Sequence, residues 1–287
     1  HPIRAIELHN YRLIQTIVNR EHARQLNESG HMINVHIKID TGMHRLGFDL
    51  SDYESIKEIY DYQFIHIQGY FTHLCVCDSK RKVDQEYTQK QIAAFYDLIN
   101  ELKLRHYDIG KVHLQSSYGL VNYPEINADY ARVGILMYGV YSTFNDYSKV
   151  QLDLKPALTI KAQIAMLHYL TKGASLGYGL TYKVNRDSVI AVIPIGYGDG
   201  LPRILSSNGS VLIKGQKCPI VGRICMDQML VDVSEISDIS DNDLVTVIGQ
   251  DGTEEIRVEE IALEANTISN EILSRLGSRL PRIYRGG

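Results

Sequence analysis

Hydrophobic and polar residues alternate strictly in two segments of the first half of the chain. In residues 31–40, one face carries Ile33, Val35, Ile37 and Ile39, and the other carries Asn34, His36, Lys38 and Asp40. In residues 64–73, one face carries Ile65, Ile67, Gly69 and Phe71, and the other carries His66, Gln68, Tyr70 and Thr72. Because the side chains of a β-strand alternate between its two faces, each segment is predicted to be a strand.

Apolar residues at helical spacing lie on both sides of these strands. They predict helices over residues 5–28 and from about residue 84 to residue 104, and Ser51 with Glu54 forms a capping-box pattern that predicts another helix. Residues 111–117 and 131–139 are predicted to be further strands. Strands therefore alternate with helices, as in a parallel sheet closed into a (β/α)8 barrel of the TIM type, whose active site lies at the carboxyl ends of the strands.

The pattern changes near residue 150. From there on, short runs rich in Val, Ile, Thr and Tyr are separated by Gly, Pro, Asn and Asp, and one short helix is predicted late, at residues 257–265. Such runs are typical of a mainly antiparallel β domain. We therefore expect a βα-barrel domain over residues 1–148 and a β domain over residues 149–287.

Composition excludes several classes of protein. Apolar residues make up 44% and charged residues 22%, which is ordinary for a globular protein with a sizeable core. The formal charge of −4 gives no indication of nucleic-acid binding, and no apolar run is long enough for a membrane span. Four cysteines form no disulfide framework, which favours the cytoplasm. The opening "HPIRAIE" lacks an initiator methionine, so we expect a longer parent protein.

The stretch "KIDTGMHRLG" follows the first alternating strand. On the barrel interpretation, Lys38 points into the interior, where an unpaired ammonium is costly. The nearest cation in sequence, Arg45, would repel it. A plain strand followed by a turn, with Asp40 bonded to the backbone, is the alternative.

The stretch "GYFTHLCVCD" leaves the second strand and offers His73. In an extended chain Cys75 and Cys77 share a face with His73, so a metal site is conceivable. The spacing matches none of the usual zinc patterns, and buried structural thiols are the favoured interpretation.

Two later stretches offer groups that bind anions. In "HLQSSYG", Ser116 and Ser117 lie where a strand becomes a helix, and "ARVGILMYG" adds Arg132 and Gly134 at the next strand end. Hydroxyls and backbone N–H groups at a helix start bind anions, although a plain N-cap explains the serines equally well. The stretches "SLGYGLTY", "IPIGYGDG" and "VGRICMDQM" would each be structural if taken alone.

Taken together and in this order, these motifs resemble the alanine racemase family over nearly the whole chain. The resemblance implies a pyridoxal-phosphate (PLP) barrel followed by a β domain, working as a homodimer with shared active sites. The family exchanges the Cα proton of an amino acid with two bases. One is the lysine that holds PLP, and the other is a tyrosine from the partner subunit.

Carried over residue by residue, the resemblance assigns Tyr178 as the partner's base, Arg132 as the residue facing the pyridine nitrogen, and His73 as the link between them. It assigns cofactor binding to Ser116, Ser117, Gly134 and Ile135. It assigns substrate contacts to Arg45, Met226, Asp227, Tyr197 and Asn270, and the access channel to Asp78 and Arg223. Lys38 matches a lysine that is carbamylated in many members, and the resulting anion would pair with Arg45.

The chain departs from the family pattern at two points. No segment matches the motif with the PLP lysine, so we expect that lysine, the first barrel strands and any membrane domain upstream, and no racemisation by these 287 residues alone. Asn270 stands where the family usually has Tyr, which predicts use of serine as well as alanine. This resembles membrane-bound serine/alanine racemases of vancomycin-resistance systems, which supply D-amino acids for cell-wall peptides.

Three alternatives stay open from the sequence. One is a related PLP barrel decarboxylase, which would not need the tyrosine in "GYGLTY" as a base. Another is a non-catalytic PLP-binding domain, which would usually lack the β domain. The third is a metal-dependent barrel hydrolase that uses His66, His73 and the cysteines.

Overall fold

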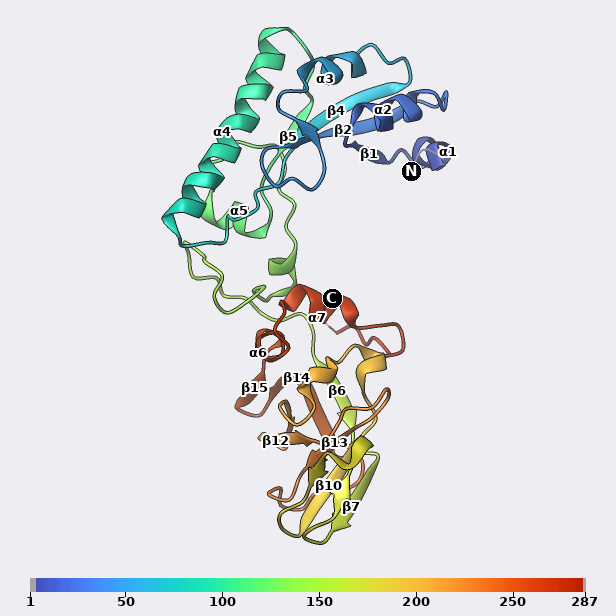
Figure 1. The fold of residues 1–287 in the computed structure, drawn as a ribbon, viewed down its shortest axis with the longest axis vertical. Helices are drawn as coiled ribbons and strands as arrows, with labels where there is room; N and C mark the ends of the chain where they lie inside the picture. The colour runs from blue at the N-terminus through green and yellow to red at the C-terminus, as the bar shows by residue number, and fades with distance from the viewer. Residues whose placement is uncertain (1–3, 286–287) are drawn as a thin grey trace. The chain divides into compact units, whose positions relative to one another are not determined.

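The computed structural model describes residues 4–285, and the chain divides into two compact units (Figure 1). The first comprises His1–Gly134 and Asp146–Leu152, and the second comprises Ile135–Asn145 and Asp153–Gly287. The chain therefore enters the second unit at Ile135, returns to the first unit at Asp146 and enters the second unit again at Asp153. The predicted boundary between residues 148 and 149 falls inside the segment that returns to the first unit.

The first unit is built on a parallel sheet with the strand order β1-β2-β4-β5, and the short β3 pairs with β2. The strands are β1 (Ile14–Ile17), β2 (Ile33–Asp40), β3 (Phe48–Asp49), β4 (Ile65–Phe71) and β5 (Lys111–His113). The helices are α1 (Ala5–Asn10), α2 (Arg20–Asn27), α3 (Tyr53–Ile59), α4 (Lys82–Leu104) and α5 (Ser117–Asn122). Strand and helix alternate along the chain, as the sequence pattern predicts for a barrel.

The prediction of one helix over residues 5–28 is wrong. A strand, β1, separates α1 from α2, and it pairs in parallel with β2 over Ile14–Ile17. The backbone turns after α1 at Arg12, which has a φ of 52°. Ile14, Thr16 and Ile17 are β-branched, so they favour a strand where a sheet partner is available.

In β4, the predicted alternation of side chains between the two faces holds only in the first half of the strand. The β2–β4 register shifts between Val35 and His36, so that Val35 pairs with Ile67 but His36 pairs with Gly69. A bulge of this kind moves the residues after it to the opposite face. Tyr70 is therefore in the core at 0% exposure, and Phe71 joins the face of His36, contrary to the prediction.

Two local predictions near helix ends are also wrong. The capping box does not form, because the hydroxyl of Ser51 donates to Asp49 and α3 begins after Asp52. Residues 131–139 form no strand and contain the 3₁₀ helix η2 (Ile135–Tyr138). In the first part of this segment, the Arg132 amide donates to the Gln115 carbonyl at 2.9 Å, which is too little pairing to continue the sheet.

The second unit is the antiparallel β domain that the sequence predicts. Its eight-stranded sheet has the order β15-β14-β11-β12-β13-β10-β7, with β6 paired to β14, and β8 and β9 form a separate hairpin. The strands are β6 (Ile160–Gln163), β7 (Met166–Leu170), β8 (Ser175–Leu176), β9 (Tyr182–Lys183), β10 (Ser188–Ile193), β11 (Ser210–Ile213), β12 (Gln216–Val221), β13 (Met229–Asp232), β14 (Leu244–Asp251) and β15 (Glu254–Ile256). The helices are η2, already described, η3 (Tyr178–Leu180), η4 (Tyr197–Asp199), η5 (Arg203–Leu205), α6 (Val258–Glu264) and α7 (Ser269–Arg275).

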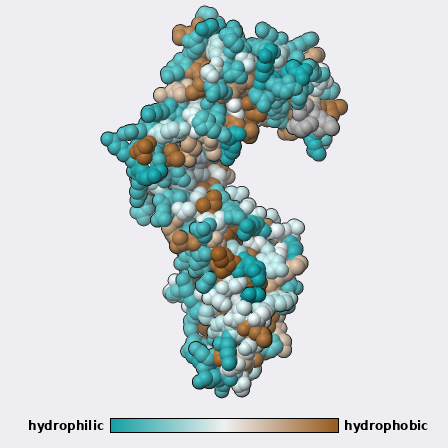
Figure 2. Space-filling view, in the orientation of Figure 1, coloured by the Kyte–Doolittle hydropathy of each residue, from teal (hydrophilic) through white to brown (hydrophobic). Residues whose placement is uncertain are grey.

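The visible surface of both units is mostly hydrophilic, with scattered apolar patches (Figure 2). Among residues 4–285, no helix combines the length and apolarity that crossing a membrane requires.

Candidate active site

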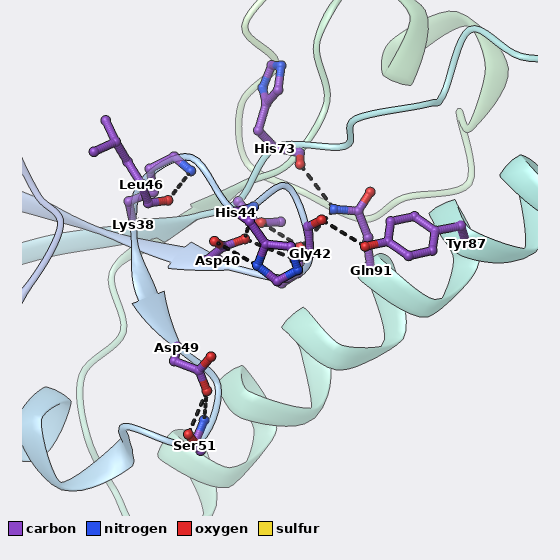
Figure 3. Close-up of polar contacts among 12 residues, drawn as sticks. Lys38, Asp40, Gly42, His44, Leu46, Asp49, Ser51, His73, Tyr87 and Gln91 are labelled. Atoms are coloured by element: carbon purple, nitrogen blue, oxygen red, sulfur yellow. Dashed lines mark hydrogen bonds and ion pairs between the residues drawn. The ribbon is translucent and has the colours of Figure 1, made fainter.

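Lys38 lies on β2 with only 6% of its surface exposed. Its ammonium donates to the Leu46 carbonyl at 2.7 Å, so the loop after the strand folds back over it (Figure 3). Burial lowers the pKa of Lys38; the charge of Asp40 opposes this, and the charges of Arg45 and Arg132 add to it. The amine is therefore easier to deprotonate than that of an exposed lysine.

Asp40 shapes this loop through main-chain bonds. Its carboxylate accepts the N–H groups of Gly42 at 2.9 Å and His44 at 3.0 Å, the backbone bonding that the alternative interpretation of this stretch expected. These bonds contribute to a lowered pKa of Asp40, although its partial burial opposes them. Arg45, on the same loop, is exposed.

Arg132 is the centre of the polar groups at the strand ends. One terminal nitrogen donates to His113 Nδ1, and the other donates to the Thr72 carbonyl at 2.7 Å and to His73 Nδ1 at 3.1 Å. The guanidinium lies over the Phe71 ring, 5.0 Å from its centroid. The bulge in β4 places Phe71 on this face, so the bulge helps to build the site.

These contacts determine the tautomers of the histidines. Arginine can only donate, so Nδ1 of both His73 and His113 must accept, and each neutral ring then carries its proton on Nε2. His113 Nε2 lies 2.8 Å from His36 Nδ1 and therefore donates to it. A chain of hydrogen bonds thus runs from His73 through Arg132 and His113 to His36.

Burial keeps this chain in one protonation state. Desolvation, followed by repulsion from Arg132, lowers the pKa of His73 to about 4 and that of His113 to about 3. Burial also lowers the pKa of Arg132 to about 10. At neutral pH both imidazoles are therefore neutral and the guanidinium holds the charge.

The next strand end brings two predicted residues together. The Gly134 amide donates to Ser117 Oγ at 2.8 Å, which joins the start of α5 to the following loop. Ser116 is the N-cap residue of α5, but its side chain makes no capping bond. A Cβ added to Gly134 would meet only Ser117 Oγ, at 3.8 Å, so space is open beside this amide.

Among the described residues, no hydrogen bond joins two of the predicted site residues, Asp78 and Ile135, to the cluster around Arg132. Asp78 is partly buried, and its carbonyl accepts the Tyr147 amide at 2.8 Å; burial and the nearby charges of Asp146 and Asp84 raise its pKa. Ile135 follows Gly134 in the chain, where the second unit begins.

The second unit presents Tyr178 at the tip of the β8–β9 hairpin. Gly177, Gly179 and Leu180 have positive φ values of 73°, 74° and 48°, so the glycines are needed for a tight turn. A Cβ on Gly179 would lie 3.1 Å from the Arg223 guanidinium, which packs against the turn. The Tyr178 side chain is 69% exposed.

Two further predicted motifs are bonded to each other. The Tyr197 amide donates to the Cys225 carbonyl at 3.1 Å, and the Gly198 amide donates to the Met226 carbonyl at 2.7 Å. Asp199, which is 4% exposed, accepts the Gly196 amide and also pairs with Arg279 at 3.3 Å. These bonds hold two loops side by side, and the predicted residues on them are exposed, namely Tyr197, Arg223, Met226 and Asp227. Asn270 is exposed on α7.

Three residues that contact this site were not predicted from the sequence. His36 and His113 extend the hydrogen-bond chain, and Phe71 stacks on His113 with 4.8 Å between ring centroids. The sequence did offer a signal for His36, because it lies on the predicted polar face of its strand together with Lys38. Among residues 4–285, no group of three or more His, Cys, Asp or Glu side chains could hold a metal ion.

Comparison with known proteins then decides the family. Residues 1–142 match the family described as "Alanine racemase, N-terminal domain", and residues 157–284 match "Alanine racemase, C-terminal domain". The chain belongs to the alanine racemase family. The predicted fold class, a barrel-type βα unit followed by an antiparallel β domain, is thereby confirmed.

Several members of the alanine racemase family are similar over nearly the whole chain. An "Amino-acid racemase" of Enterococcus faecalis is 42% identical over 99% of this chain, and a "Serine/alanine racemase" of Enterococcus gallinarum is 39% identical over 97%. The chain spans 40% of the first relative and 39% of the second. The crystal structure of the Bacillus anthracis alanine racemase with bound L-Ala-P has a TM-score of 0.92 at 28% identity, covering 99% of this chain and 74% of that one.

The residues of the first unit fit the PLP that this family uses. The uncapped start of α5, the Ser117 hydroxyl and the open space at Gly134 suit a phosphate. All bonds described for the Arg132 guanidinium use its two terminal nitrogens, so its Nε–H is the donor that could meet the ring nitrogen.

Proposed function

We propose that this chain carries catalytic residues of a PLP-dependent amino-acid racemase that interconverts the L- and D-forms of alanine and serine. The observation that carries the proposal is the state of Arg132. This buried guanidinium is held by main-chain carbonyls and neutral imidazoles, and burial lowers its pKa. Within the described part of the chain, Arg132 forms no ion pair with a carboxylate. Such an arrangement suits a partner that accepts a hydrogen bond without taking the proton.

When bound, PLP supplies an electron sink that makes the Cα proton of an amino acid acidic. Arg132 would face the ring nitrogen and leave it unprotonated, because a guanidinium does not readily give up its proton. A glutamate at this position, expected in a decarboxylase of this architecture, would protonate it. The lysine that holds PLP would come from a part of the protein outside these residues.

Tyr178 would be the base on the L-face, contributed by the partner subunit of a homodimer. Tyr178 is 69% exposed and lies at a tight turn, so a second chain can reach its phenol. His73 has its Nδ1 occupied by Arg132, which leaves Nε2–H to donate to the tyrosine oxygen. That bond would stabilise the phenolate and so help the phenol to act as a base.

The first test is racemisation by the full-length protein. We expect wild-type protein with PLP to convert L-alanine to D-alanine without releasing CO₂, and Tyr178→Phe to bind PLP but lose exchange of the proton on the L-face. Tyr182→Phe, in the same hairpin, is the matched control and should stay active. Near-normal racemisation by Tyr178→Phe would refute the role, and CO₂ release would favour the decarboxylase.

Mixed dimers test the shared site. Arg132→Ala and Tyr178→Phe proteins should each be inactive alone, but a mixed dimer has one site with both residues intact if the tyrosine acts on the partner. Random mixing forms mixed dimers in half of the molecules, so about a quarter of the wild-type activity should return. No recovery at all would mean that Tyr178 serves its own chain.

Carbamylation of Lys38 belongs to the same proposal. Burial lowers the pKa of this amine, which increases the neutral form that reacts with CO₂. The product is an anion, so Arg45 would attract it instead of repelling the ammonium. Incubation with ¹³C-bicarbonate should give a carbamate ¹³C signal that is absent from Lys38→Ala; an identical signal in that variant would refute the assignment.

Serine use is proposed from Asn270, which is exposed on α7. Its side chain is shorter than tyrosine and offers both a donor and an acceptor to a hydroxymethyl group. The similarity to a serine/alanine racemase supports this. Asn270→Tyr should lower the serine-to-alanine ratio of kcat/KM, and an unchanged ratio would contradict the idea.

The cellular role is also a proposal. D-alanine and D-serine are components of cell-wall peptides, and a serine-using member would suit a vancomycin-resistance system. The four free cysteines agree with a cytoplasmic catalytic domain, whose parent protein would also carry a membrane domain. Cell fractionation with an antibody against these residues tests the location: a purely soluble pool would exclude the membrane domain.

A further inference from the structure

Helix α4 buries a stripe of side chains whose character changes along the helix. The buried positions near its start are polar, namely Asp84, Thr88 and Gln91, and those that follow are apolar, namely Phe95, Leu98, Ile99 and Leu102. In a βα unit the helix starts near the carboxyl end of the strand before it, where the site lies. The polar half of the stripe therefore faces the strand-end loops.

Gln91 is the member of this stripe that reaches two of those loops. Its amide is 1% exposed. The nitrogen donates to the His73 carbonyl at 3.3 Å (Figure 3) and to Thr41 Oγ1 at 3.3 Å. The oxygen accepts the Cys75 amide at 3.1 Å. In a parallel sheet, a neighbouring strand bonds a carbonyl and the N–H group two residues later in the chain. The Gln91 amide bonds such a pair, the His73 carbonyl and the Cys75 N–H, so it takes the place of a neighbouring strand for the segment that follows β4.

The contacts continue from Gln91 to the Arg132 cluster. Thr41 Oγ1 lies 2.8 Å from Thr72 Oγ1, and the Thr72 carbonyl accepts from Arg132 at 2.7 Å. The same guanidinium nitrogen bonds His73 Nδ1. The main chain on both sides of His73 is thus held at Thr72 by Arg132 and at the His73 carbonyl and Cys75 amide by Gln91.

We infer that Gln91 is a positioning residue for racemisation: its amide holds the His73 main chain so that the imidazole meets Arg132 and presents Nε2–H to the catalytic tyrosine. This inference rests on the proposed function. Gln91 does not contact the reacting atoms and acts through His73. Because a displacement of about 1 Å at such a group can cost roughly a hundredfold in rate, loss of the clamp should lower kcat more than it raises KM.

A substitution at Tyr87, one turn earlier on α4, is a control that distinguishes this effect from a general loosening of the helix. Its hydroxyl donates to the Gly42 carbonyl at 2.7 Å, so it holds the loop after β2 and not His73 (Figure 3). Tyr87→Phe should therefore leave the His73 ring unchanged. Gln89 is exposed on the same helix and provides the matched control for each substitution at Gln91.

The experiment compares Gln91→Leu and Gln91→Glu with Gln89→Leu and Gln89→Glu in the full-length protein. Hydrogen exchange at the Cys75 amide and ¹⁵N NMR of the His73 ring are measured without substrate. Gln91→Leu should speed the exchange and mix the His73 tautomers. Gln91→Glu keeps the acceptor for Cys75 but loses the donor, so it should mix the tautomers with less effect on exchange. Both Gln89 variants should match the wild type.

Kinetics in both directions complete the test. Both Gln91 variants leave buried polar groups without a partner and should be less stable, so kinetics are measured well below the melting temperature of each variant. There both should lose roughly tenfold to a hundredfold in kcat, with an increased Cα-deuterium isotope effect on proton removal at the L-face. Gln91→Glu should recover at acidic pH, where a protonated carboxyl can again donate to the His73 carbonyl. A wild-type His73 spectrum and wild-type Cys75 exchange in Gln91→Leu would overturn the inference. Absence of racemisation by the wild type would overturn the proposed function, while the exchange and NMR data would still decide whether Gln91 holds His73.

Discussion

The neutral, buried histidine at the end of β5 makes the first unit sensitive to acid. Burial and the charge of Arg132 lower the pKa of His113 from 6.5 to about 3, with a smaller effect from His36 and an opposing one from Asp129. Below pH 6.5 the unfolded chain takes up a proton that the folded site refuses. Folding stability from this group is therefore complete above about pH 6.5 and is lost as the pH falls towards 3.

The size of the effect follows from the two pKa values of His113. One unit of difference in pKa corresponds to about 1.4 kcal/mol. At about pH 5 the unfolded imidazole is largely protonated and the folded one is not, so we expect a loss of about 2 kcal/mol relative to pH 7. His73, whose pKa is lowered to about 4, adds a loss of the same sign.

Hydrogen exchange at the β2 and β4 amides measures this loss, because it reports the opening of the first unit separately from the second. Exchange rates, corrected for their intrinsic pH dependence, give the opening free energy at each pH. His113→Gln removes one of the two titrating groups and should reduce the pH dependence between about pH 5 and 6.5, leaving the part due to His73. His66→Gln, at an exposed position of β4, is the control. An equal slope in wild type and His113→Gln would refute the reasoning.

Three further predictions concern stability. Asn122→Leu leaves two carbonyls and one amide of the first unit without their buried partner, so its opening free energy in hydrogen exchange should fall by roughly 3 kcal/mol or more; a fall below 1 kcal/mol would contradict this. Tyr70→Phe loses one hydrogen bond to Tyr60, which keeps the Asp108 carbonyl as acceptor, so exchange should report a loss of only about 1 kcal/mol. Gly139→Ala places a Cβ 1.8 Å from the Lys155 carbonyl at a φ of 72°, so the melting temperature of the second unit should fall, and an unchanged value would show that this turn can relax.

Much of the fold could be predicted from local patterns. The strict alternation in residues 33–40 reflects a strand with one fully buried face, and Ile33, Val35, Ile37 and Ile39 are all 0% exposed. The change of pattern near residue 150 correctly predicted the antiparallel domain. The helix over residues 5–28 was wrong because β1 is stabilised by its pairing with β2, an interaction that helical spacing within one segment does not reveal.

The motifs also named several residues of the site before their geometry was known. Three of them lie close to strand ends of the first unit, namely Lys38 on β2, His73 after β4 and Ser117 after β5, and each is bonded there. Arg132 and Gly134 lie in the loop that follows α5 and bond to His73 and Ser117. Their proposed roles come from family resemblance and await the experiments above. The contact of Gln91 with the His73 loop was not predicted, because a buried polar residue in a helical stripe has no signature of its own.

The sequence by itself determined most of the succession of strands and helices, the change to an antiparallel domain and the family, because periodicity and motif order are properties of neighbouring residues. Only the tertiary structure decided which side Phe71 faces, which nitrogen of each histidine accepts from Arg132, and how far α4 reaches into the site. These features depend on the register between strands and on contacts between residues up to 77 positions apart, and no local pattern encodes them.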